Sequence, residues 1–324
     1  MSATADVRSE VARAGFRHDA LLYAGEDEFV ERVGAFVREG LDRGEGVLVA
    51  TSVRKLELLG RLLGDAAAPV TFVDMAEVGR NPARIIPVWQ RFVDIERGRG
   101  RRPRGVGEPV WPGRSDAELA ECRRHESLLN LAFHDGPAWE LLCPYDRSTL
   151  GPAVLAEAER THPHVVDGRE RRESDCFEGD EAAGLPFAAP LPDPPADALE
   201  LRVERDSLRE LRRRVVEAAV VAGLDEARRG NLVLAVDEVA TNSVRHGGGT
   251  GTLRLWRETD AVVCEVRDGG SIGDPLAGRR RPELDRANGR GLWLANHLCD
   301  LVELRSGPRG TVVRLHVRGG RADG

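Results

Sequence analysis

Three polar side chains recur at every fourth position of residues 234–249, which read LAVDEVATNSVRHGGG. They are Glu238, Asn242 and His246, and helical residues spaced by four lie nearly on one face. A carboxylate and an amide on adjacent turns offer the hard oxygen ligands that suit Mg²⁺ beside substrate phosphates. The spacing therefore indicates either a magnesium site on this helix, with His246 packing or capping at its end, or a solvated helix face.

A second motif follows in residues 265–275, EVRDGGSIGDP. Asp268 comes directly after an apolar, strand-like run and directly before Gly269 and Gly270. An aspartate at the end of a strand can accept a hydrogen bond from an exocyclic amine, and glycine lets a ligand approach the backbone closely. Taken alone, D-G-G is also typical of an ordinary turn.

A third motif, NGRGLWLANHLCD in residues 288–300, places Gly289 and Gly291 at the start of a helix. Backbone N–H groups and the helix dipole make such a start an anion site, and Arg290 lies between the two glycines. Each motif is weak by itself. Their order favours a phosphate-binding site: a helix with E-x-x-x-N, a strand ending in Asp268, a loop, and then G-x-G opening a helix.

These stretches resemble the GHKL ATPase family, and within it the anti-sigma-factor serine kinases. DEVATNSVRHG resembles the N box, VRDGGSIGDP the G1 box, and GRGLWLANHLCDLVEL with GTVVRL the G2 box and closing strands, over about residues 199–318. The resemblance implies that Asn242 coordinates Mg²⁺ and that Glu238 orients or deprotonates the attacking hydroxyl. It also implies contacts with ATP: the adenine amine at Asp268 beside Gly270, and the phosphates near Gly289, Arg290 and Gly291.

The same resemblance implies a function. The protein would phosphorylate a serine or threonine of a small anti-anti-sigma (STAS-type) partner, using Mg-ATP, and related kinases commonly form homodimers. An alternative is a binding module that holds ATP without turnover and sequesters a sigma factor. The presence of Glu238 favours the kinase.

The first half of the chain alternates between apolar runs and amphipathic stretches, which predicts a mostly parallel α/β sheet with helical cover. FRHDALLYAGEDEFVERVGAFVREGLDRGEGVLVATS in residues 16–52 and ELLCPYD further on resemble the MEDS sensory domain over about residues 15–165. That resemblance implies a RecA-like fold without a working phosphate loop and a sensory input. Lys55 is the single lysine and lies in SVRKLELL, so the chain has no Walker A motif.

A small-molecule signal needs a pocket in this half. We expect His18, just before the first strand, and Tyr23 within it to line one at a sheet edge, unless His18 merely packs or caps. Further polar candidates without a discriminating pattern are Glu108, His125, Glu126, Asn130 and Tyr145. The pair His125–Glu126 raises a third function, that of a histidine kinase phosphorylated on His125. No helical-hairpin pattern follows this pair, which disfavours that hypothesis.

The two halves meet at residues 179–198, GDEAAGLPFAAPLPDPPADA, where five prolines within fourteen residues predict a semi-extended linker. We expect a sensory domain over residues 1–178 and an ATPase domain over residues 199–324. In the latter, strands and helices predict an α+β sandwich of the GHKL (Bergerat) type: a mixed sheet with helices on one face.

Composition excludes several other classes. The chain has 324 residues, 41% of them hydrophobic and 31% charged, which suits two soluble domains. Its net charge of −7 argues against nucleic acid as the main partner. Five scattered cysteines without C-x-x-C spacing predict reduced, mostly buried thiols and disfavour zinc and thioredoxin-type chemistry. No apolar run is long enough for a membrane span or a signal peptide, so we expect a cytoplasmic protein.

Overall fold

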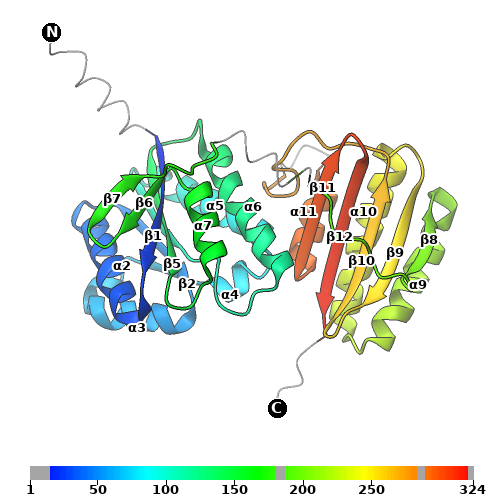
Figure 1. The fold of residues 1–324 in the computed structure, drawn as a ribbon, viewed down its shortest axis with the longest axis horizontal. Helices are drawn as coiled ribbons and strands as arrows, with labels where there is room; N and C mark the ends of the chain where they lie inside the picture. Colours follow the sequence, from blue (N-terminus) through cyan, green and yellow to red (C-terminus); the bar gives the residue numbers. More distant parts are fainter. Residues whose placement is uncertain (1–14, 180–186, 188, 283–288, 320–324) are drawn as a thin grey trace, which may run out of the picture. The chain divides into compact units, whose positions relative to one another are not determined.

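The computed structural model describes residues 15–179, 187, 189–282 and 289–319. The chain divides into two compact units, Met1–Ala183 and Gly184–Gly324 (Figure 1). This division falls within the expected linker, of which residues 180–186 and 188 lie outside the described part. Among the described residues, no helix is long and apolar enough to cross a membrane.

The first unit is built on a seven-stranded sheet with the order β3-β2-β4-β5-β1-β6-β7. All neighbouring strands run parallel except the last pair, in which β7 is antiparallel to β6. The strands are β1 (Phe16–Tyr23), β2 (Gly46–Thr51), β3 (Thr71–Asp74), β4 (Pro103–Gly107), β5 (Trp139–Asp146), β6 (His164–Asp167) and β7 (Glu170–Glu173). The predicted mostly parallel sheet is confirmed.

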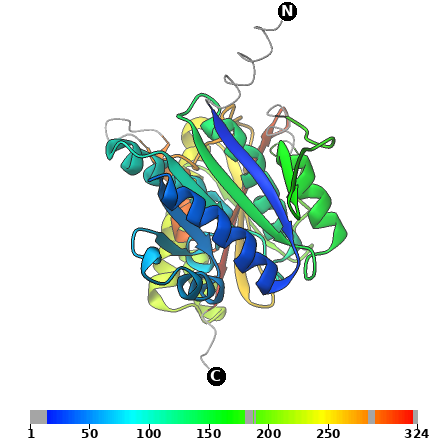
Figure 2. The same cartoon turned by 90° about the vertical axis from the view of Figure 1, so that its left-hand side faces the viewer.

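Helices cover both faces of this sheet (Figure 1). One face carries α2 (Gly25–Asp42) and α3 (Val53–Leu63), and Figure 2 shows α2 crossing in front of the strands. The other face carries α5 (Ile85–Gly98), α6 (Asp116–Phe133) and α7 (Pro152–Thr161). Shorter helical turns are η1 (Gly64–Ala67), α4 (Met75–Val78) and η2 (Pro82–Arg84).

Strand alternation separates two sets of buried side chains in the first unit. Leu21 and Tyr23 of β1 pack with Phe29 and Val33 of α2. On the opposite face, Trp139 contacts both Phe133 and Trp89, with ring centroids 4.8 and 5.9 Å apart. The sequence analysis did not predict α7, β6 or β7. The two strands give little signal, because each is only four residues long and ERRE of β7 is entirely exposed.

The second unit is a five-stranded antiparallel sheet with the order β11-β12-β10-β9-β8. Its strands are β8 (Leu199–Val203), β9 (Gly251–Arg257), β10 (Ala261–Asp268), β11 (Leu301–Gly307) and β12 (Gly310–Arg318). One face is covered by α9 (Leu208–Val221), α10 (Glu226–His246) and α11 (Arg290–Leu298), and the turn η4 (Arg205–Ser207) precedes α9 (Figure 1). This arrangement confirms the predicted α+β class with helices on one face. The expectation of a mixed sheet was wrong, because every neighbouring pair of strands is antiparallel.

The long helix α10 forms the centre of the second core. Asp225 caps it by accepting a hydrogen bond from Arg228 N at 2.8 Å, and Gly247 follows its last residue. Its apolar residues, such as Val236 and Val239, pack with alternate residues of β10. Part of the expected linker also packs on this unit, since Phe187 joins the same core and the Pro192 carbonyl accepts a hydrogen bond from Arg314 at 2.6 Å.

The sheet face away from these helices carries buried charges held in pairs. Arg314 donates to Glu265 at 2.6 Å, and His316 Nε2 lies 3.0 Å from Glu303 Oε2. Burial alone would lower the pKa of His316, but hydrogen bonds to Glu258 and Glu303 outweigh it and raise the pKa above its ordinary value. The proton on His316 therefore stabilises β11 and β12.

We expect this stabilisation to depend on pH. Because the folded pKa of His316 is raised, its contribution is fully present below the unfolded pKa of about 6.5 and is lost as the pH rises through the folded value. Hydrogen exchange of β11 and β12 in the full chain, corrected for intrinsic rates, should show less protection at about pH 8.5 than at about pH 6. His316→Gln should remove most of that difference; an unchanged pH dependence would contradict the assignment.

Candidate functional site

The predicted polar row lies on α10 with unequal exposure. Glu238 and Asn242 are half-buried, and His246 is exposed at the end of the helix. Their neighbours Val239 and Ser243 are buried, so the row borders the core. Glu238 and Asn242 therefore face packed protein on one side, which restricts their orientation in a way that an exposed helix face does not.

Gly291 brings the third motif against this row. It is buried near the start of α11, and a Cβ atom there would lie 2.9 Å from Asn242 Nδ2 and 2.9 Å from Glu238 Oε2. A side chain at this position would displace one of the two polar groups, because real Cβ atoms do not approach other atoms so closely. The lack of a side chain thus lets α11 lie against the polar face of α10 without moving the ends of Asn242 and Glu238.

The second motif meets the C-terminal end of α10. Asp268 Oδ2 accepts a hydrogen bond from Ser243 Oγ at 2.5 Å, and Asp268 Oδ1 accepts one from Gly270 N at 2.8 Å. A Cβ atom at Gly270 would lie 2.8 Å from the His246 carbonyl oxygen. Each carboxylate oxygen has a second lone-pair direction, so Asp268 is oriented and still able to accept from a ligand.

A small cavity of about 60 Å³ lies between these groups. Asn242, Asp268 and Gly270 line it together with Ser243, His246 and Thr311, and its apolar lining comes from Val239, Ile272, Leu292 and Val313. This volume is well below the roughly 300–1,000 Å³ of typical small-molecule sites, so a nucleotide would extend beyond this cavity. The residues predicted to contact the adenine, Asp268 and Gly270, therefore line one small cavity together with Asn242.

The predicted phosphate side is only partly described. Gly289 precedes α11 with φ +93°, a left-handed conformation that favours glycine, and Arg290 is exposed as the first residue of α11. Residues 283–288, which include the first residue of the predicted glycine motif, lie outside the described part of the chain.

In the first unit, the structure does not bring His18 and Tyr23 together. His18 lies inside β1, and not before it as the sequence suggested, because the polar run Arg17–Asp19 hides the first half of the strand. β1 is flanked by β5 and β6, so it is not an edge strand. Since side chains alternate along a strand, His18 and Tyr23, five residues apart, face opposite sides of the sheet.

Tyr23 belongs to an ion cluster at the ends of the parallel strands. Its hydroxyl donates to Glu108 Oε1 at 2.6 Å, and Lys55 Nζ lies 2.6 Å from both the hydroxyl and that carboxylate oxygen. The Thr51 hydroxyl donates to the other oxygen of Glu108. Burial and the charge of Glu108 raise the pKa of Tyr23 far above its ordinary value, so it stays a neutral hydrogen-bond donor.

His18 belongs to a different cluster, beneath α6 and α7. Its Nε2 lies 3.0 Å from Glu126 Oε2, and its Nδ1 lies 3.0 Å from Asn130 Oδ1. Burial and the nearby His162 lower the pKa of His18, against the opposing effect of Glu126, so the imidazole is neutral at pH 7. Of the further polar candidates, Glu126, Asn130 and Tyr145 gather here, whereas Glu108 lies on the other face.

Sequence reasoning missed three members of these sites. Ser243 orients Asp268, and Cys143 and His162 join the His18 cluster. Ser243 lies within DEVATNSVRHG and Cys143 within ELLCPYD, but neither side chain was singled out in these motifs, and His162 lies outside them. Cys143 and His162 become neighbours of His18 through strand pairing, which spacing along the chain does not reveal.

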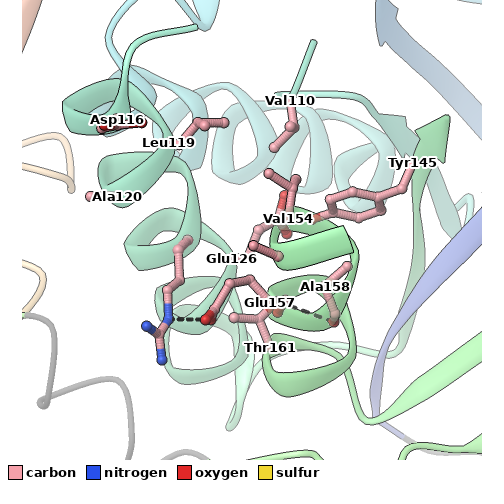
Figure 3. A pocket seen from close by; sticks show the side chains of 12 residues that line it. Val110, Asp116, Leu119, Ala120, Glu126, Tyr145, Val154, Glu157, Ala158 and Thr161 are labelled. Carbon is pink, nitrogen blue, oxygen red and sulfur yellow. Dashed lines mark hydrogen bonds and ion pairs between the residues drawn. The ribbon is translucent and has the colours of Figure 1, made fainter. Parts of the chain in front are cut away.

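A pocket of about 270 Å³ lies beside the His18 cluster, between α6 and α7 (Figure 3). Figure 3 shows Leu119 and Ala120 of α6 on one side and Val154 and Ala158 of α7 on the other. Most of the lining surface is apolar, although six of the twelve lining residues are polar or charged: Asp116, Arg123, Glu126, Tyr145, Glu157 and Thr161. Such a mostly apolar pocket with a few polar groups is typical of small-molecule sites.

The histidine-kinase hypothesis finds no support in the position of His125. This residue lies within α6, beneath the surface of the first unit, with 1% of its area exposed. A phosphoryl acceptor has to reach the γ-phosphate of ATP, and a side chain at this depth does not.

Comparisons with known proteins agree with the two-part organisation. Residues 17–163 match the family model of the methanogen/methylotroph DcmR sensory (MEDS) domain, and residues 201–317 match that of the histidine kinase-like ATPase domain. No curated protein matches the chain.

Two solved structures show weaker likenesses. The RsbU and RsbW domains of Rv1364c from Mycobacterium tuberculosis are 21% identical, with a TM-score of 0.29, over 38% of this chain and 33% of that chain. The match thus spans about a third of that protein's length. The ATPase domain of G40P is 11% identical, with a TM-score of 0.31, over 48% of this chain and 69% of its own. At these TM-scores, neither likeness bears on the function.

The two family matches agree with the architecture of the units in which they lie. The first falls on the mostly parallel α/β sheet, and the second falls on the antiparallel sheet whose helices carry the three motifs. The chain therefore joins a MEDS domain, in residues 17–163, to a histidine kinase-like ATPase domain, in residues 201–317.

Proposed function

We propose that this protein is a sensor-regulator whose ATPase domain binds Mg-ATP and phosphorylates a serine or threonine on a STAS-type anti-anti-sigma partner. The observation that carries the proposal is the approach of Gly291 to Glu238 and Asn242, next to the cavity that holds Asp268. Three motifs separated by up to about 50 residues thereby meet at one place. Phosphoryl transfer depends mainly on such positioning and on neutralising charge.

Each residue has a defined role in this proposal. Asn242 supplies one oxygen ligand to Mg²⁺, whose remaining positions are taken by water and phosphate oxygens. Glu238, one turn away, orients or deprotonates the attacking hydroxyl of the partner. Asp268 accepts a hydrogen bond from the adenine amine, with Gly270 beside the base. Gly289 and Arg290 lie at the N-terminus of α11, where backbone N–H groups suit the phosphates.

The MEDS domain is the sensory half of the proposal. Its pocket between α6 and α7 is the place for a small-molecule signal, and the response would alter phosphorylation or sequestration of the partner regulator. A sigma factor is a second binding partner, and a homodimer is the proposed assembly. The alternative is a binding module that holds ATP and sequesters a sigma factor without turnover.

Removing the magnesium ligand should weaken nucleotide binding. Calorimetric titration of the full chain with ATP should show Mg²⁺-dependent binding, and Asn242→Ala should reduce the affinity about tenfold or more, or about 1.4 kcal/mol. The matched control is Asn231→Ala, the same substitution on α10 outside the cavity. Equal affinities for the wild type and Asn242→Ala would contradict the magnesium role.

Removing the carboxylate should separate binding from catalysis. Glu238→Gln keeps the shape of the side chain but loses the base, so transfer of phosphate from ATP to a STAS partner should fall about 10²- to 10⁴-fold with ATP affinity retained. Glu226→Gln, in the exposed first turn of α10, is the control. If the wild type itself transfers no phosphate while sequestering a sigma factor, the binding-module alternative replaces the kinase.

Filling the space at Gly291 should damage the site without unfolding the domain. Gly291→Ala adds a methyl group 2.9 Å from Asn242 Nδ2 and Glu238 Oε2, so one of these side-chain ends has to leave its position in the site. ATP affinity should fall by about tenfold or more while the circular dichroism spectrum is retained. Gly307→Ala, where an added methyl group meets open space, should have no effect, and an unaffected Gly291→Ala would refute the close packing.

A further inference from the structure

Four buried side chains with metal-binding atoms converge in the MEDS domain. They are His18 on β1, Glu126 on α6, Cys143 on β5 and His162 after α7, and one ligand atom from each lies within 4.8 Å of the other three. Each side chain is at most 1% exposed. Because they come from four separate elements, the fold itself, and not a local sequence motif, places them together.

The hydrogen bonds around His18 fix which of its nitrogens carries the proton. Asn130 Nδ2 donates to the Thr161 carbonyl at 2.9 Å, so Asn130 Oδ1 is the atom that faces His18 Nδ1, at 3.0 Å. An oxygen at that position accepts, and therefore Nδ1 carries the hydrogen. In the neutral imidazole, Nε2 then presents a lone pair, and this is the nitrogen that lies 3.0 Å from Glu126 and 3.3 Å from Cys143 Sγ.

His162 is oriented in the same way. Its Nδ1 lies 2.8 Å from the Ala158 carbonyl oxygen, an acceptor, so Nδ1 carries the hydrogen, and in the neutral ring Nε2 then carries the lone pair. That Nε2 is buried and makes no hydrogen bond to any residue in the described ranges, although Glu126 Oε2 lies 3.4 Å away. The imidazole rings of His18 and His162 are also close, with centroids 4.0 Å apart.

The cluster therefore brings electron pairs together without enough protons to pair them. With both rings in the neutral form, two imidazole lone pairs and the Glu126 carboxylate point toward one another, and the protons available to them are those of the Cys143 thiol and the Tyr145 hydroxyl. Burying polar groups that face each other as acceptors is costly unless a cation lies between them. Histidines whose Nδ1 hydrogen is donated to a carbonyl oxygen are the usual arrangement around a bound metal ion, because the outer bond fixes the ring.

We propose that His18, Glu126, Cys143 and His162 bind a divalent transition-metal ion of the Zn²⁺ class. Two nitrogens, one sulfur and one oxygen match the ligands that zinc takes, whereas Mg²⁺ and Ca²⁺ require oxygen. Tetrahedral ligands at zinc bond lengths lie about 3.3–3.7 Å apart, near the 3.0–3.6 Å of the pairs Glu126–His18, His18–Cys143 and Cys143–Glu126. Binding displaces the thiol proton of Cys143 and involves no change of oxidation state.

The pocket between α6 and α7 gives this site a route to solvent, since Glu126 and Tyr145 line both (Figure 3). Resting on the proposed sensory function, the metal would contact a small signal molecule that enters through this mostly apolar pocket. A ligand with an electron-pair donor at one end and an apolar body fits both parts of the site. ATP binding by the other domain tests the proposed kinase separately, because it does not depend on a metal ion at this site.

The test is metal binding by the purified full chain. After chelation and dialysis, titration with Co²⁺ alone should saturate at one ion per chain and produce both the ligand-field bands of a tetrahedral site and a thiolate-to-cobalt charge-transfer band. Zn²⁺ should displace the Co²⁺ and abolish these bands. A chain that binds no Co²⁺, or binds it without the thiolate band, would overturn the proposal and leave a hydrogen-bonded core cluster.

Variants identify the ligands. Cys143→Ser should abolish the charge-transfer band, and His162→Gln should weaken Co²⁺ binding by about tenfold or more. The control is Cys122→Ser, another fully buried thiol, whose Sγ donates to the Pro109 carbonyl at 3.4 Å and which should keep the wild-type spectrum. Loss of the band in Cys122→Ser but not in Cys143→Ser would also overturn the assignment. An unchanged circular dichroism spectrum and melting temperature show that a variant of the MEDS domain is folded. Absence of ATP binding by the wild type would count against the proposed kinase alone, because ATP binds to the other unit.

Discussion

The packing of α11 against α10 is the contact on which the candidate nucleotide site depends. Gly291 lies at this contact, and a Cβ atom there would lie 2.9 Å from the side-chain ends of Asn242 and Glu238, so one of them would have to shift. Once the two helices lie together, the polar row of α10 faces the start of α11, and Asp268 at the end of β10 completes the group through Ser243. A single small residue thus links three motifs that are far apart in the sequence.

The first unit obeys a different constraint, the alternation of side chains in a parallel sheet. β1 sends Tyr23 to the face of α2 and His18 to the face of α6, so one strand supports two unrelated polar clusters. In the Tyr23 cluster, Lys55 neutralises Glu108 and the donors match the acceptors. In the His18 cluster they do not match, and this imbalance is the physical basis for the inferred metal ion.

The sequence predicted those features of the structure that depend on residues close together along the chain. Helix α10, with its Asp225 cap and glycine end, and the glycine motifs around Asp268 and Gly291 were readable because capping and glycine spacing act over a few residues. The mostly parallel sheet of the first unit and the α+β class of the second were predicted from the order of strands and helices along the chain. The sequence did not reveal that Gly291 approaches Glu238, because this depends on how α11 packs.

Longer-range features escaped prediction for the same reason. The pairing of β1 with β5 and β6 brings Cys143 and His162 to His18, although these residues lie more than a hundred positions from it. Cys143 was expected to be an ordinary buried thiol, and burial is the part of that expectation that the structure bears out. The polar residues at the start of β1 also made the predicted strand begin too late, so His18 was expected before the strand and not within it.

The most direct test of the account is a crystal structure of the full chain with Mg²⁺ and a non-hydrolysable ATP analogue. The account predicts the adenine against Asp268 and Gly270, the metal ion coordinated by Asn242, and the phosphates at the start of α11 beside Gly291. A nucleotide bound elsewhere, or bound with Asn242 and Asp268 both out of contact, would contradict the central claim that these three motifs form one nucleotide site.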